Sequence, residues 1–125
     1  MPLCEHYLEA ERARALLGPD KIIGVSAHSP EEARRARKVE ADYLGCGAAF
    51  VTGTKADAKP ISKGTIRAVT AAAGIPVVAI GGVSRENILE LCGLGLAGVA
   101  VVSGIFGQKD IEAAAQELLE LSKQL

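Results

Sequence analysis

Four short apolar runs alternate with longer amphipathic segments, and this alternation limits the fold more than any other feature. The runs cover residues 22–26, 43–47, 77–80 and 98–102. Apolar residues follow one another within them instead of alternating with polar ones, which is typical of strands buried on both faces of a parallel sheet. Alternating strands and helices predict an α/β fold, either an open doubly wound sheet or a (β/α)8 barrel.

Local signals place helices between these runs. Ser29, Pro30 and Glu32 form a predicted capping box at the start of one helix, and Gly74 is a typical helix stop. Ser84 is expected to cap a helix that reaches Cys92. The predicted helices cover 8–17, 30–39, 65–73, 84–92 and a segment that begins near 110, with a short turn or helix at 103–106.

The length predicts a single domain that is half of a barrel. The chain has 125 residues and no low-complexity linker, whereas a full (β/α)8 barrel takes about 250 residues. Residues 1–125 are therefore expected to form one parallel (β/α)4 half of a TIM barrel. Such a half leaves two unpaired sheet edges and an apolar inner face, so we expect a homodimer, which could complete the barrel. The residues expected to be exposed on this inner face, in alternate sets, are Ile23, Val25, Leu44, Val78, Ile80 and Val101.

The net charge, the apolar segments and the cysteines limit the classes of partner and the cellular location that we expect. The net charge of −1 lacks the basic excess that nucleic acid or an anionic membrane requires. No stretch approaches the ~20 apolar residues of a membrane span, and residues 1–11 contain no signal-peptide core. The three cysteines form no CxxC pair, so we expect them to be reduced. These features predict a cytoplasmic protein that binds neither nucleic acid nor membrane.

Glycines, small hydroxylated residues and one lysine collect directly after the predicted strands. Ligands bind at the carboxyl ends of the strands in both candidate architectures. Backbone N–H groups exposed at glycines, hydroxyl donors and a cation together suit a phosphate. Each feature also occurs as a plain tight turn or a solvated side chain, but their combination predicts a site for a phosphorylated small molecule. The residues are Ser26, His28, Thr52, Gly53, Thr54, Lys55, Gly81, Gly82, Ser103 and Gly104.

Four segments, in the correct order, resemble the C-terminal β/α units of thiamine phosphate synthases. The segments are 21–33, 41–55, 75–82 and 98–106, and the second contains a Thr-Gly-Thr-Lys motif at 52–55. The resemblance extends from about Ala13 to the end of the chain, whereas residues 1–11 are not expected to share it. Ala48 and Ala49 stand where the family has a proline-containing approach to this motif.

The resemblance implies a transferase of thiamine biosynthesis that joins hydroxymethylpyrimidine pyrophosphate to thiazole phosphate, releases pyrophosphate and uses Mg²⁺. It implies that Lys55 and Ser26 contact the pyrimidine pyrophosphate in catalysis. Residues expected to hold the thiazole phosphate are Thr52, Gly53, Thr54, Gly82, Val102 and Ser103. The family's metal-binding aspartates belong to its first four β/α units, so no metal ligand is expected in this chain. We therefore expect a truncated or partial synthase that binds phosphates but is poorly active alone.

Two other functions stay open. Thiazole tautomerases, a sister family, resemble this chain too and have a histidine at the position of His28, but they have a cysteine where Thr54 stands. Gly81 and His28 are accordingly further possible site residues. A half barrel that only oligomerises, without catalysis, is the third hypothesis.

Overall fold

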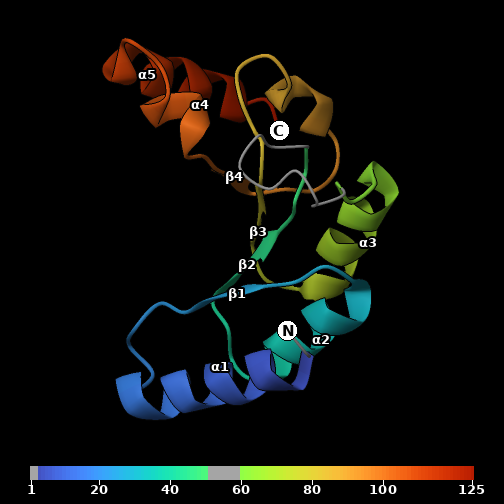
Figure 1. The fold of residues 1–125 in the computed structure, drawn as a ribbon. Helices are drawn as coiled ribbons and strands as arrows, with labels where there is room; N and C mark the ends of the chain where they lie inside the picture. The colour runs from blue at the N-terminus through green and yellow to red at the C-terminus, as the bar shows by residue number, and fades with distance from the viewer. Residues whose placement is uncertain (1–2, 51–59) are drawn as a thin grey trace.

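The computed structural model describes residues 3–50 and 60–125, which contain one four-stranded parallel sheet with the strand order β1-β2-β3-β4. This is the α/β half-barrel arrangement expected from the sequence (Figure 1). The elements are α1 (Leu3–Leu17), β1 (Gly24–Ser26), α2 (Pro30–Lys38), β2 (Tyr43–Cys46), α3 (Lys63–Ala73), β3 (Val77–Ile80), η1 (Ile88–Leu91), β4 (Gly98–Ala100), α4 (Ser103–Phe106) and α5 (Ile111–Ser122). Among the described helices, none combines the length and apolar character that crossing a membrane demands.

The strand register brings the carboxyl ends of all four strands to one rim. Val25 pairs with Leu44, and Leu44 pairs in turn with Val77. Ala79 pairs with Val99 at the other side of the sheet. Since every pair is parallel and each strand lies beside its neighbour in sequence, the segment after each strand leaves the sheet at this same rim.

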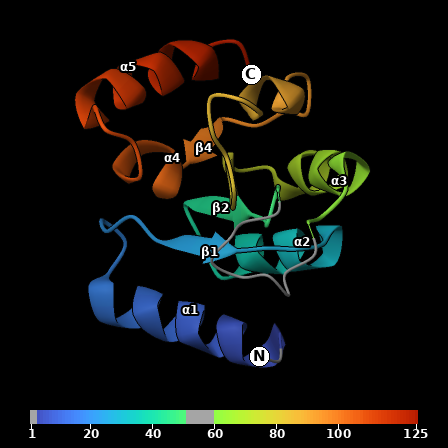
Figure 2. The same ribbon diagram turned by 45° about the horizontal axis from the view of Figure 1, so that its top comes forward.

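One face of the sheet is covered by α2 and α3, which lie side by side in Figure 2. Leu44 and Cys46 of β2 are fully buried beneath them. The helices contribute small or branched aliphatic side chains, and no aromatic residue is among the buried core residues described. The buried helix residues are Ala33 and Ala36 of α2, and Ile66, Val69 and Ala73 of α3.

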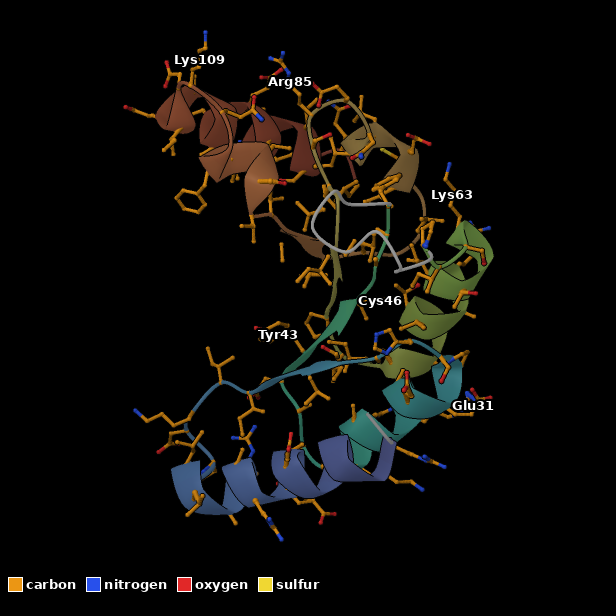
Figure 3. All side chains as sticks on the ribbon, in the orientation of Figure 1. Glu31, Tyr43, Cys46, Lys63, Arg85 and Lys109 are labelled. Carbon is orange, nitrogen blue, oxygen red and sulfur yellow. The ribbon has the colours of Figure 1, made fainter. Side chains whose placement is uncertain are left out.

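The opposite, inner face is open. Strand alternation places Tyr43, Val78 and Ile80 there, and Figure 3 shows Tyr43 and Cys46 on opposite sides of β2. Tyr43 is 39% exposed and Ile80 is 44% exposed.

The expected inner-face set is therefore only partly correct. Val78 and Ile80 lie on the inner face as expected. Ile23, Val25 and Leu44 instead alternate onto the helix-covered side, and Val101 packs at the edge of the core. Because these strands are apolar on both faces, the sequence does not reveal which alternate set faces the helices.

The predicted cap of α2 and the predicted stop of α3 are both formed. Ser29 Oγ accepts a hydrogen bond from the Glu32 backbone N–H (3.2 Å), while the Glu32 carboxylate accepts one from the backbone N–H of His28. Gly74 ends α3 with a left-handed φ of 67°. α3 begins before the expected residue 65, because Ser62 accepts the Thr65 N–H at 3.0 Å and serves as its cap.

The helix expected at 84–92 is not formed. Ser84 does not cap it; instead its backbone N–H donates to Asn87 Oδ1 (2.8 Å). Only a short 3-10 helix, η1, follows, held in place by the buried side chains of Ile88 and Leu91. A side chain that bonds to nearby backbone groups competes with regular helix, which explains the difference.

The two cysteines with described side chains differ in environment. Cys46 is buried, and burial, with a smaller contribution from the charge of Glu32, raises its pKa to about 11. Cys92 is exposed. Both are free thiols.

An ion pair ties α1 to the starts of β1 and β2. Arg14 Nη2 lies 2.8 Å from Asp42 Oδ2, and the same oxygen accepts the backbone N–H of Ile23 (2.7 Å). The hydrogen bond from Ile23 and then the one from Arg14 hold the pKa of Asp42 below its ordinary value of 3.8. Arg14 also donates to the carbonyl oxygens of Gly18, Lys21 and Glu40.

We predict that Asp42→Asn removes an acid-dependent part of the stability. A carboxyl group whose folded pKa is lowered stabilises the fold above its unfolded pKa, and that contribution is lost as the pH falls through the folded pKa. The difference in free energy of unfolding between the two proteins should be constant above about pH 5 and shrink below about pH 4. Urea unfolding across this range measures it. Glu120→Gln, which removes an exposed pair with Lys123, is the control, and a pH-independent difference for Asp42→Asn would contradict the assignment.

Candidate functional site

A pocket of about 520 Å³ lies at the rim formed by the carboxyl ends of the strands. All four strands contribute to it. The lining residues lie at or just after the carboxyl end of each strand: Ser26 and His28 for β1, Gly45, Gly47 and Ala48 for β2, Ile80, Gly81, Gly82 and Val83 for β3, and Ala100, Val101, Val102 and Ser103 for β4. Of the eleven site residues expected from the sequence, six are thus brought together here: Ser26, His28, Gly81, Gly82, Val102 and Ser103. Gly104 is not among the lining residues of this pocket.

The other four expected residues, Thr52, Gly53, Thr54 and Lys55, lie outside the described residues. Their described flanks are anchored at the pocket. The Phe50 N–H donates to the Gly81 carbonyl oxygen (3.0 Å), and the Ile61 N–H donates to the carbonyl oxygen of Ala48 (2.8 Å). The chain therefore enters and leaves the segment 51–59 beside this rim.

The turn after β3 requires glycine for two independent reasons. Gly81 and Gly82 have φ values of 98° and 67°, in the left-handed region that side chains disfavour. A Cβ at position 81 would also lie 2.8 Å from both Cα and Cβ of Ala48. The small residues on both sides allow the β3 turn to pass against the end of β2, where it lines the pocket.

Asn87 shapes this turn, although it was not among the expected site residues. Its Nδ2 donates to the Gly82 carbonyl oxygen and its Oδ1 accepts from the Ser84 N–H, both at 2.8 Å. The available signal was an asparagine three residues after Ser84 in a polar segment following two glycines, since asparagine commonly bonds to nearby backbone in turns.

Ser26 and His28 stand on the β1 side of the pocket. Backbone pairing with β2 extends past β1, because the Ala27 N–H donates to the Gly45 carbonyl oxygen (2.9 Å). His28 Nδ1 lies 3.3 Å from Glu32 Oε2 across the first turn of α2. The capping carboxylate of α2 thereby also orients the imidazole at the edge of the pocket.

The described lining offers donors for an anion. It contains two hydroxyl groups, several backbone segments freed by glycine and one titratable side chain, His28, but no carboxylate. Such a lining suits a phosphate. Mg²⁺ prefers carboxylate and phosphate oxygens, so this lining alone does not fit the ion. Across residues 3–50 and 60–125, no group of three or more His, Cys, Asp or Glu residues is arranged to hold a metal.

Comparison with known proteins gives a consistent result. A family model described as thiamine monophosphate synthase matches residues 3–105. The thiamine-phosphate synthase of Ruminiclostridium cellulolyticum is 49% identical over 114 residues, which cover 91% of this chain and 54% of that protein. The corresponding enzyme of Moorella thermoacetica is 48% identical over 115 residues, covering 91% of this chain and 55% of that protein.

A solved structure agrees with these sequence relatives. The thiamine phosphate pyrophosphorylase from Pyrococcus furiosus superposes with a TM-score of 0.80 and 38% identity, over 98% of this chain and 55% of that chain. The chain spans about half the length of the relatives it matches. The expectation that residues 1–11 do not resemble the family is wrong, since the family match begins at residue 3.

We predict that Gly81→Ala destabilises the fold more than Gly93→Ala. Gly93 has a similar φ of 79° but open space around its Cβ position, so Gly93→Ala should cost only the strain of the left-handed conformation, about 1 kcal/mol. Gly81→Ala adds the overlap with Ala48, expected to cost about 1–3 kcal/mol more. Urea unfolding of both variants tests this, and equal losses would show that Ala48 does not restrict position 81.

Proposed function

This chain belongs to the thiamine monophosphate synthase family, and from that premise we propose that its rim pocket serves the family's reaction. In that reaction hydroxymethylpyrimidine pyrophosphate is joined to thiazole phosphate and pyrophosphate is released. The observation that supports the proposal best is the convergence of all four strand ends on one pocket whose described lining suits phosphate. We include the cytoplasmic location in the proposal, because phosphorylated intermediates are found inside cells.

The thiazole phosphate is assigned to the turns after β3 and β4. Gly82, Val102 and Ser103 line the same pocket, and Thr52, Gly53 and Thr54 belong to the segment that begins beside Gly81. A phosphate dianion placed here meets no carboxylate among the described lining residues. Backbone amides and a hydroxyl group hold it in a fixed position, as such donors do at other phosphate sites.

The pyrimidine pyrophosphate is assigned to Ser26 and Lys55. Negative charge grows on the pyrophosphate as its bond to the pyrimidine methylene carbon breaks, and a cation directed at it stabilises that charge. Lys55 is the cation proposed for this role, and Ser26 contributes a hydroxyl donor from the β1 side.

Mg²⁺ would add further positive charge to the pyrophosphate. Because the described lining supplies no carboxylate for it, we assign no step to the ion in these 125 residues. We propose that the chain alone binds both phosphorylated substrates but turns them over poorly, since groups that act together lose most of their effect when only part of the set is present.

We predict that the purified chain, supplied with both substrates and Mg²⁺, forms no thiamine phosphate at a useful rate. Adding a polypeptide with the part of the R. cellulolyticum relative that this chain does not match should produce activity. Lys55→Ala should then lower it by about 100-fold or more. Lys109→Ala, at an exposed position outside the rim pocket, is the matched control. Turnover by the chain alone, abolished by Lys55→Ala, would contradict the proposal.

A tautomerase-like activity is the second candidate, because His28 lines the pocket and is oriented by Glu32. Exchange of deuterium into the thiazole ring, abolished by His28→Asn, would identify this activity. A scaffold without catalysis would bind neither substrate, so titration with thiazole phosphate separates it from both enzymatic proposals.

We also propose that the chain forms a homodimer through its open surfaces. Within the described sheet, β1 and β4 each pair on one side only. At the rim, Val102 is 72% exposed and lines the pocket together with the exposed Ile80, and Phe106 of α4 is 68% exposed. Unpaired edges and apolar surface of this kind favour association.

The helices at the two ends of the chain would crowd the junctions of a dimer that closes into a ring. In a β/α repeat one helix covers each junction between neighbouring strands, but here α1 lies beyond β1 and α5 lies beyond β4 (Figure 2). A ring of two copies would join β4 of one to β1 of the other, so each junction would receive two helices. A unit of four strands joined by three helices, with none beyond its ends, would leave one helix per junction.

We predict that the chain is a dimer at micromolar concentration, with twice the 12.9 kDa mass of the chain. The dimer should dissociate when a unit of four strands joined by three helices, with no helix beyond its ends, is added. Light scattering coupled to gel filtration measures both species. Val102→Asp and Phe106→Asp should weaken the dimer, whereas Leu16→Asp, at an exposed position on α1 away from the rim pocket, is the control. A monomer without the partner, or a dimer that persists in its presence, would count against this assembly.

A further inference from the structure

We propose that Asn87 is a positioning residue that fixes the Gly82 turn against α4 and thereby sets the spacing between the two turns assigned to the phosphate. This inference rests on the proposed phosphate site. Asn87 is not among the lining residues of the pocket, so its effect on a ligand passes through the backbone that it holds.

The Asn87 amide bonds to the turn on both sides of Val83. Nδ2 donates to the Gly82 carbonyl oxygen before Val83, and Oδ1 accepts the Ser84 N–H after it, each at 2.8 Å. The backbone N–H of Asn87 also donates to the Ser84 carbonyl oxygen (3.2 Å). One side chain thus fixes the direction in which the chain leaves the glycine pair.

The backbone next to Asn87 is anchored in the core. The next residue, Ile88, is fully buried, and its N–H donates to the Ser84 carbonyl oxygen at 2.9 Å. Its side chain belongs to the hydrophobic core. Because this anchor does not depend on the amide group, replacing Asn87 should loosen the turn while the core below it stays in place.

The far side of the same turn lies directly against α4. A Cβ at Gly104 would lie 2.6 Å from the Val83 carbonyl oxygen and 3.4 Å from Ser84 Cα. Gly104 follows Ser103, which lines the pocket. The segment that Asn87 holds is therefore the surface against which the Ser103 turn packs. If the Gly82 turn moves, its distance from the Ser103 turn changes.

The chemistry at position 87 requires both an acceptor and a donor. Alanine removes both hydrogen bonds, whereas aspartate keeps an acceptor for the Ser84 N–H and, when ionised, has no donor for the Gly82 carbonyl oxygen. Comparing these two variants therefore distinguishes the contribution of the amide oxygen from that of the amide N–H group. Thr70→Ala is the control, because it removes a side-chain bond to the Leu94 carbonyl oxygen (2.6 Å) at a position outside the pocket lining.

The experiment uses the full chain labelled with ¹⁵N and two probes, inorganic phosphate and thiazole phosphate. In the unmodified protein, phosphate should shift the Gly82 and Ser103 amide signals together. Asn87→Ala should weaken binding by about ten-fold and remove the Gly82 shift, with no such effect of Thr70→Ala at matched stability. In the ligand-free protein, hydrogen exchange at the Ser84 amide should accelerate in Asn87→Ala and stay slow in Asn87→Asp.

Each outcome decides one of the two proposals. Unchanged affinity and unchanged Gly82 shifts in Asn87→Ala would overturn the positioning role. If the unmodified protein binds neither probe, the proposed function is wrong, and hydrogen exchange still decides whether Asn87 fixes the turn. Unchanged exchange at Ser84 in Asn87→Ala would then overturn that as well.

Discussion

The backbone pairing between β2 and β3 continues past both strands, and the rim depends on this continuation. Ala49 and Phe50 donate to the carbonyl oxygens of Ile80 and Gly81 (2.9 and 3.0 Å), although the chain has already turned left-handed at Gly81. The two segments approach this closely because Ala48 occupies the space that a side chain at 81 would need. These two hydrogen bonds therefore hold Phe50, the last described residue before the segment that contains Lys55, beside the β3 turn.

The two ends of the sheet carry different electrostatic features. Asp42 precedes β2 and accepts hydrogen bonds from Arg14 and Ile23, so this fixed negative charge lies at the amino ends of the strands. The rim at the carboxyl ends has hydroxyl and backbone groups and no carboxylate in its described lining. An anion at the rim is thus separated by the length of the strands from the carboxylate that anchors α1, and the two functions, stability and binding, do not compete.

The sequence was sufficient for the fold class and for much of the rim, because alternating apolar runs specify parallel strands and parallel strands gather their carboxyl ends. The sequence was not sufficient where two alternative structures share the same local sequence pattern. Leu44 could face either side of a sheet that is apolar on both. The segment after Ser84 looks helical until the bonds of Asn87 to Gly82 and Ser84 are known. The turn that these bonds hold packs against Gly104, which lies twenty residues after Ser84 in the chain.

The first pair of residues in the sheet register, Gly24 and Tyr43, also has a consequence for sequence divergence. A Cβ at position 24 would lie 2.6 Å from Cε1 of Tyr43, so the ring occupies the space above the glycine on the inner face. A bulkier residue at 24 therefore requires either a smaller residue at 43 or rotation of the partly exposed Tyr43 ring away from the glycine. A smaller residue at 43 makes room for a side chain at 24, so we expect substitutions at the two positions to occur together more often than independently, although neither position belongs to the rim where the ligand is proposed to bind.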